Sequence, residues 1–135
     1  MLGEQIAEER GKLTVLRVLP SEGGHPRVEV SFQAAGKILG IDSTDMGTYC
    51  SVLGEDGVLR GEGQGVIMTG QGDMVTWSGQ GIGRLTGQGT GSSWRGAIYY
   101  KTSSQQLGRL NSVAAIFEHE VDGEGNVHNL VWEWK

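Results

Sequence analysis

The sequence predicts a single all-β domain over residues 1–135, a closed antiparallel up-and-down barrel of about eight strands. Turn sequences that combine glycine with Asp, Asn, Gln or Ser recur along the chain. Between them lie runs rich in Val, Ile, Thr, Trp and Tyr, which are typical of strands. These runs follow one another too closely for helical crossovers, so consecutive strands should pair as a meander.

The turn signals divide the chain into eight expected strands and two uncertain segments. Residues 1–11 are expected to form an N-terminal extension outside the barrel, and residues 36–44 alternate too poorly to place. The expected strands are 12–20, 27–35, 45–53, 58–69, 73–86, 93–102, 112–122 and 127–135.

Composition excludes several classes of function. The protein has a net charge of −5 and a pI of about 5.1, so its surface repels phosphate. This argues against binding to nucleic acid and to an anionic membrane surface. The single cysteine, Cys50, rules out an intrachain disulfide. Met1–Lys12 lacks the apolar core of a signal peptide, and no apolar run approaches the ~18 residues that span a bilayer. We therefore expect a cytoplasmic protein with no nucleic-acid or membrane partner.

Glycine is the anomalous residue, with 24 in the chain and fourteen of them from Gly54 to Gly96. A three-residue turn at 70–72 predicts Gly63 opposite Gly79, and Gly65 opposite Trp77. Seven glycines then share one face of three neighbouring strands, which needs a reason because strand glycine contributes no packing. They are Gly61, Gly63, Gly65, Gly79, Gly81, Gly83 and Gly96.

Three explanations for this glycine patch compete. Strong barrel curvature would let Trp77 and Trp94 lie over glycine backbone, or the patch would line a ligand pocket, or it would face outward against a partner subunit. In the outward case Glu62 and Arg84 would point into a polar lumen. We favour glycines inward because large apolar residues share their face. These are Val75, Trp77, Leu85, Trp94 and Ile98.

The last two strands alternate most clearly. Pairing across a four-residue loop, 123–126, predicts His119 opposite Leu130 and His128 opposite Val121, with both histidines inside the barrel. They would be diagonal neighbours, ~7–8 Å apart at the backbone. The same pairing turns Trp132 and Trp134 inward.

No motif names a reaction. The glycine runs do not match a dinucleotide or P-loop motif, and the histidines and Cys50 lack metal-ligand spacing, so neither a cofactor nor a metal is expected. Cys50 is expected to be a small packing residue. An inward histidine is usually a hydrogen-bonded core residue, yet His119, His128 and Tyr100 are the candidate catalytic groups. The expected ligand-lining residues are Trp77, Trp94, Phe117, Trp132, Trp134, Gly63, Gly79 and Gly81.

The cysteine-poor meander with Gly-X-Gly strands, at residues 61–65 and 76–87, resembles the allene oxide cyclase-like barrels of the calycin-like group. The resemblance implies a barrel, trimeric association and an apolar lumen that cyclises an unsaturated fatty epoxide without a cofactor. Dirigent relatives steer radical coupling without chemistry of their own. No functional residue of that family matches position by position, so none is transferred.

We therefore expect a small-molecule-binding barrel with an apolar lumen and an apolar small molecule as its partner. If it is catalytic, it would be a cofactor-free isomerase or cyclase. The alternative is a non-catalytic homo-oligomeric interaction protein whose barrel is filled by its own side chains. A dimer or trimer is expected because apolar residues fall on outward faces. They are Val66, Met68, Ile82, Ala114, Ile116 and Val131.

Overall fold

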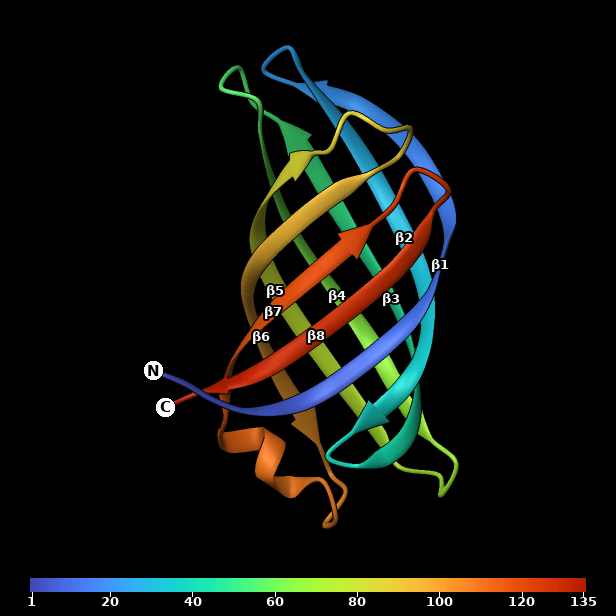
Figure 1. Cartoon of the computed structure of the whole chain (residues 1–135), viewed down its shortest axis with the longest axis vertical. Helices are drawn as coiled ribbons and strands as arrows, with labels where there is room; N and C mark the ends of the chain where they lie inside the picture. Colours follow the sequence, from blue (N-terminus) through green and yellow to red (C-terminus); the bar gives the residue numbers. More distant parts are fainter.

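The computed structural model describes residues 1–135 as one closed barrel in which each strand is antiparallel to its neighbours (Figure 1). The strand order β1 to β8 follows the chain, so the predicted all-β class and meander are confirmed. The chain ends lie side by side, and the Lys135 N–H donates to the Met1 carbonyl at 2.8 Å. The elements are β1 (Leu2–Glu22), β2 (His25–Ile38), β3 (Ile41–Leu53), β4 (Val58–Thr69), β5 (Met74–Leu85), β6 (Ser92–Thr102), the 3₁₀ helix η1 (Gly108–Ser112), β7 (Ala114–Val121) and β8 (Asn126–Trp134).

The expected N-terminal extension is wrong, because β1 begins at Leu2 and closes the barrel. Ala7 lies opposite Ile38 of β2 on one side and Val131 of β8 on the other. Ile6, Ala7 and Glu9 are all buried. The apolar alternation is hidden here because the inward position after Ala7 is a carboxyl, Glu9.

The uncertain segment at residues 36–44 consists of the end of β2, the start of β3 and the hairpin between them. Leu39 and Gly40 have φ angles of 48° and 79°, the geometry of a tight two-residue turn. Ile38 therefore lies directly opposite Ile41. The alternation of apolar and polar residues is lost at this turn, which explains why the sequence pattern did not show the ends of β2 and β3 on either side of it.

The predicted loop between β7 and β8 is one residue too long. The loop has three residues, Gly123–Gly125, and Gly125 has a φ of 85°. The Asp122 carboxylate oxygen Oδ1 accepts from the backbone N–H groups of Glu124 and Asn126, at 2.9 Å each. This side-chain contact fixes the short turn.

The shorter loop shifts the β7–β8 register by one residue and reverses the faces of β8. His119 lies opposite Asn129, and His128 lies opposite Glu120, not opposite Leu130 and Val121 as predicted. Val127, Asn129 and Val131 are buried, so the outward placement of Val131 is also wrong. The residues that move to the outer face are His128, Trp132 and Trp134.

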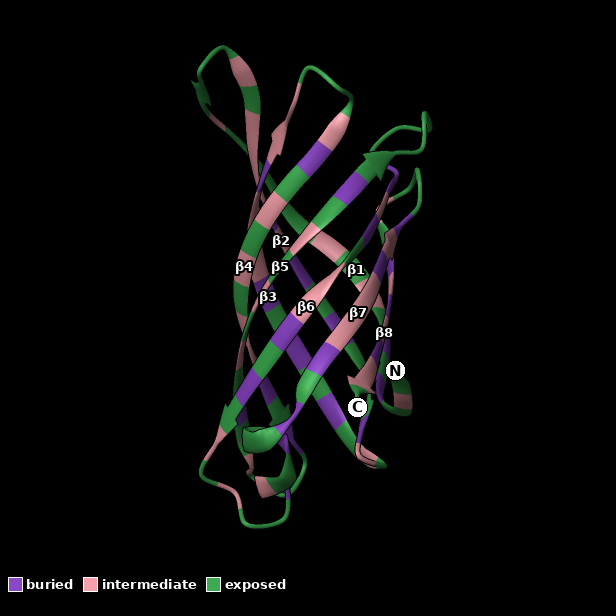
Figure 2. Cartoon of the chain, turned by 90° about the vertical axis from the view of Figure 1, so that its left-hand side faces the viewer, coloured by how far each residue is buried: buried purple, intermediate pink, exposed green.

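The predicted β4–β5 register is confirmed, and the glycines face inward. Gly63 lies opposite Gly79, and Gly65 lies opposite Trp77. Figure 2 shows how burial alternates along the strands. A Cβ added at Gly65 would lie 2.3 Å from the Trp77 ring, and one added at Gly83 would lie 2.5 Å from the Trp94 ring. Curvature with rings over glycine therefore explains the outer part of the glycine patch.

The centre of the glycine patch has a different environment. A Cβ at Gly79 would meet the Ala97 carbonyl oxygen at 3.0 Å, and its next neighbours lie at 3.7 Å. Gly63, Gly79 and Gly81 line an interior cavity together with Trp77 and Trp94. Rings over curved backbone therefore explain part of the patch, and another part lines a cavity. The outward explanation is wrong.

Alanine substitutions should distinguish these two environments. Gly65→Ala should lower the free energy of unfolding by ~1–3 kcal/mol, because its methyl group overlaps the Trp77 ring. Gly79→Ala should cost less, because its methyl group is close only to the Ala97 carbonyl oxygen, at 3.0 Å, and alanine loses less backbone entropy on folding. Urea titration of both variants measures the difference. Equal costs would contradict ring packing at Gly65 and a looser environment at Gly79.

Candidate functional site

The barrel interior contains a cavity in which the centre of a water molecule can reach about 80 Å³. One water needs roughly 10–15 Å³ on this measure, so the cavity has room for several waters or for a small organic molecule. Six aromatic side chains contribute to its wall, and the three central glycines add no side-chain volume. The aromatic residues are Phe32, Tyr49, Trp77, Trp94, Tyr100 and Phe117.

The polar residues around the cavity form two hydrogen-bonded groups on different strands. The indole Nε1–H of Trp77 on β5 donates to Oδ1 of Asp45 on β3, at 2.8 Å. The Asn129 amide on β8 donates to Oε1 of Glu9 on β1, also at 2.8 Å. The two groups meet at the carboxyls of Glu9 and Asp45, which interact directly.

The inward histidine is held as a core residue. Asn129 uses its amide N–H on Glu9, so its carbonyl oxygen accepts from Nδ1 of His119. Nε2 of His119 is then the acceptor for the Tyr49 hydroxyl, at 2.9 Å. Burial lowers the pKa of His119, which keeps the ring neutral. His119 orients Tyr49 in this network and has no free nitrogen for another partner.

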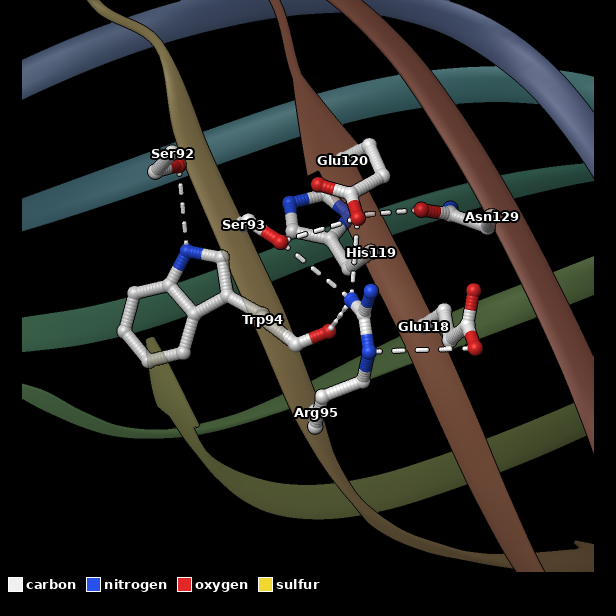
Figure 3. Close-up of polar contacts among 8 residues, drawn as sticks. All are labelled: Ser92, Ser93, Trp94, Arg95, Glu118, His119, Glu120 and Asn129. Atoms are coloured by element: carbon white, nitrogen blue, oxygen red, sulfur yellow. Dashed lines mark hydrogen bonds and ion pairs between the residues drawn. The ribbon is translucent and has the colours of Figure 1, made fainter. Parts of the chain in front are cut away.

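Figure 3 shows how the β6–β7 pair separates charges from the interior. Trp94 and His119 lie directly opposite each other and are both buried. On the next, outward positions, Arg95 binds Glu118 at 3.7 Å and Glu120 at 2.9 Å. Arg95, the cation that pairs with these two glutamates, therefore lies on the outer face of the barrel.

Glu9 and Asp45 form a buried acidic pair, 7% and 5% exposed. Burial and then the neighbouring Glu9 raise the pKa of Asp45 to about 9, against the opposing effect of the Trp77 hydrogen bond. Asp45 therefore holds a proton at neutral pH. No lysine or arginine is among the residues that line the cavity.

Tyr100 supplies the one free hydroxyl of the site. Its side chain is 6% exposed and lines the cavity. Every fully enclosed polar side-chain atom has a hydrogen-bond partner, so the Tyr100 hydroxyl, which makes no hydrogen bond to the protein, is reachable from the cavity. Burial, followed by the charges of Glu9 and Asp45, raises its pKa, so the phenol stays protonated. A buried tyrosine hydroxyl normally finds a partner, so this one is open to a bound molecule.

The structure brings only part of the expected site together. His119, Tyr100, Phe117, Trp77, Trp94, Gly63, Gly79 and Gly81 line the cavity. His128 does not, because its Nε2 contacts Glu8 at 2.8 Å on the outer face. Trp132 and Trp134 also lie outside, for the register reason given above. The outward alternatives, Glu62 and Arg84, do not point into the lumen, although Glu62 reaches the cavity wall.

Sequence reasoning missed Glu9, Asp45, Tyr49 and Asn129. Asp45 and Tyr49 occupy alternate positions of β3 with Gly47 between them, a signal that was available but was masked by the polar character of the inward row. Glu9 was missed because its strand was not expected. Asn129 was assigned to the wrong face with the rest of β8.

Comparisons with known proteins identify the fold. No protein-family model matches the chain, and no curated protein matches its sequence. A β-barrel-like protein from Acinetobacter baumannii has a TM-score of 0.83 and 13% identity over 100% of this chain and 96% of its own. A protein of unknown function from Clostridium acetobutylicum has a TM-score of 0.82 and 11% identity, covering 98% of each chain.

Two further structures are similar. A conserved protein of unknown function from Rhodopseudomonas palustris has a TM-score of 0.82 and 12% identity over 99% of each chain. An enzyme from Penicillium herquei has a TM-score of 0.68 and 16% identity, covering 95% of this chain and 92% of its own. These likenesses show the β-barrel fold.

No group of three or more His, Cys, Asp or Glu side chains is placed to hold a metal ion, and no helix is long and apolar enough to cross a membrane.

The proton on Asp45 predicts a specific pH dependence of stability. Between pH 7 and 9 the folded protein keeps this proton, whereas the unfolded chain, with an Asp pKa near 3.8, has already lost it. The free energy of unfolding should therefore fall by roughly 2 kcal/mol across this window. His119 does not interfere, because its folded pKa lies below the unfolded value of 6.5.

Asp45→Asn is the matched variant, because an amide reproduces the protonated carboxyl and has no proton to lose. Urea titrations at pH 7 and pH 9 should show the wild type losing more stability than Asp45→Asn. Parallel losses in the two proteins would refute the buried proton.

Proposed function

We propose that the barrel binds a small, mostly apolar molecule that carries one polar group, in the cavity between the central glycines and the aromatic residues. The observation that carries this proposal is the free hydroxyl of Tyr100 beside open volume. In the absence of a ligand this hydroxyl has no hydrogen-bond partner in the protein and is reachable from the cavity. A ligand group that hydrogen-bonds to it would set the ligand's orientation.

Cofactor-free isomerisation is the catalytic form of this proposal, in line with the allene oxide cyclase-like, calycin-like resemblance. It is favoured by the buried pair of Glu9 and Asp45, in which burial raises the pKa of Asp45 to about 9. A carboxyl that keeps its proton at neutral pH can act as a general acid. Tyr100 would hold the reacting molecule beside this pair, since all three side chains line the same cavity.

Homo-oligomerisation is a second proposal with its own observation. Beyond Lys12, the last β1 residue that lies opposite β8, residues 14–22 of β1 pair only with β2 and leave an unpaired strand edge. This edge exposes Val15, Leu16 and Val18, the last of them by 83%. An exposed apolar edge is a template for another strand. A second copy of the chain would pair with it around a two-fold axis.

Toluene and benzyl alcohol test the binding proposal directly. Both should shift the indole N–H signals of Trp77 and Trp94 in NMR titrations, because both indoles belong to the cavity wall. Tyr100→Phe should weaken benzyl alcohol about tenfold and leave toluene unchanged, since only the alcohol uses the hydroxyl. Tyr99→Phe is the control, because Tyr99 is exposed on the outer face. Absence of any shift with either compound would overturn the proposal.

Light scattering tests the oligomer. The wild type should be a dimer that Val18→Lys converts to a monomer, because a charge at the unpaired edge blocks strand addition. Ile82→Lys is the control, since Ile82 is also exposed, by 54%, but lies on β5, which is paired on both sides. A monomeric wild type would exclude the edge interface.

A further inference from the structure

We propose that the molecule bound in this cavity is a small organic cation, a protonated amine attached to an apolar group. This inference rests on the proposed binding function and specifies the chemistry of its ligand. It depends on the acidic pair, the free phenol and the aromatic wall, which are three separate features of the same cavity.

The acidic pair lacks the cation that buried carboxyls normally have. Glu9 receives a hydrogen bond from the Asn129 amide, and Asp45 receives one from the Trp77 indole, so both partners are neutral. Neither carboxyl forms an ion pair, while Glu8, the neighbour of Glu9 on the outer face, contacts both Arg10 and His128. Buried carboxyls are usually paired with a positive group, and here none is present.

The free hydroxyl of Tyr100 marks where the cation would be held. The Tyr100 side chain is more than nine-tenths buried, and it lines the same cavity as Glu9 and Asp45. The phenol oxygen accepts an N–H of an ammonium group, and the two carboxyls supply the opposite charge. An ammonium therefore finds both kinds of partner in one place.

The aromatic wall suits the rest of such a ligand. Trp77, Trp94, Tyr49 and Phe117 line the same cavity, and an ammonium near aromatic ring faces is attracted by their electron density. Their apolar surfaces also pack against a hydrocarbon group. An anionic ligand would add a further negative charge beside Glu9 and Asp45 with no Lys or Arg on the cavity wall to offset it. The site therefore selects against carboxylates, including fatty acids.

Binding of a cation has a proton balance that a neutral ligand lacks. The ammonium keeps its charge and stabilises the ionised form of Asp45, so the O–H bond of that carboxyl breaks and its proton passes to the buffer. Between zero and one proton should be released for each amine bound near pH 7.5. A neutral isostere should release none.

Three isosteric probes test the inference on the whole wild-type chain: benzylammonium, benzyl alcohol and benzoate. Calorimetry near pH 7.5, in two buffers of different ionisation enthalpy, measures affinity and proton release together. Benzylammonium should bind about tenfold more tightly than benzyl alcohol and should release protons. Benzoate should not bind. The double variant Glu9→Gln with Asp45→Asn should lose the preference for the amine, and Glu55→Gln, an exposed turn carboxylate, should keep it.

The outcomes separate this inference from the function on which it rests. Equal affinity for benzylammonium and benzyl alcohol without proton release overturns the cationic ligand and leaves the binding proposal standing. Failure of all three probes to bind overturns both. If the double variant does not fold, proton release by the wild-type protein still decides the question.

Discussion

Closure of the barrel depends on residues 7–12 of β1, which pair with β2 on one side and with β8 on the other. Strands approach so closely here that a Cβ at Gly11 or Gly36 would fall within 2 Å of a carbonyl oxygen on the neighbouring strand. Glycine is therefore required where the wall closes. The same pairing sets Glu9 opposite Asn129 and brings it inside beside Asp45. The polar part of the cavity thus exists only because β1 closes the wall.

The barrel interior is packed in some places and open in others. Where a tryptophan ring lies over a glycine the interior is filled, and elsewhere it contains the cavity. Trp77 covers Gly65 and Gly47, while Trp94 covers Gly61 and Gly83. Hydrogen bonds from the indoles to Asp45 and to Ser92 hold both rings in place. The nearest atoms to the central glycines belong to neighbouring strands, to Tyr49 and to Phe117, and these glycines line the cavity. Packed rings and open volume are therefore two regions of one lumen.

The sequence was sufficient where a turn and a two-residue alternation agreed. The three-residue loop at 70–72 gave the β4–β5 register, and the inward face followed from the large residues beside the glycines. It was insufficient where one residue of loop length reversed a strand, as in β8, because both faces of that strand carry apolar residues. The inward carboxyls could not be predicted for a different reason. Glu9 and Asp45 break the apolar pattern that reveals a buried strand face.

That break in pattern is the strongest link between structure and function. Replacing a buried ionisable pair with well-packed apolar residues is often neutral or stabilising, so stability alone does not account for Glu9 and Asp45 in the lumen. Other buried polar side chains of the lumen are fully satisfied within the protein. The acidic pair and Tyr100 differ because they stand at the cavity and lack, respectively, a cation and a hydrogen-bond partner. These incomplete groups, placed together at open volume, are the basis of the proposed binding function.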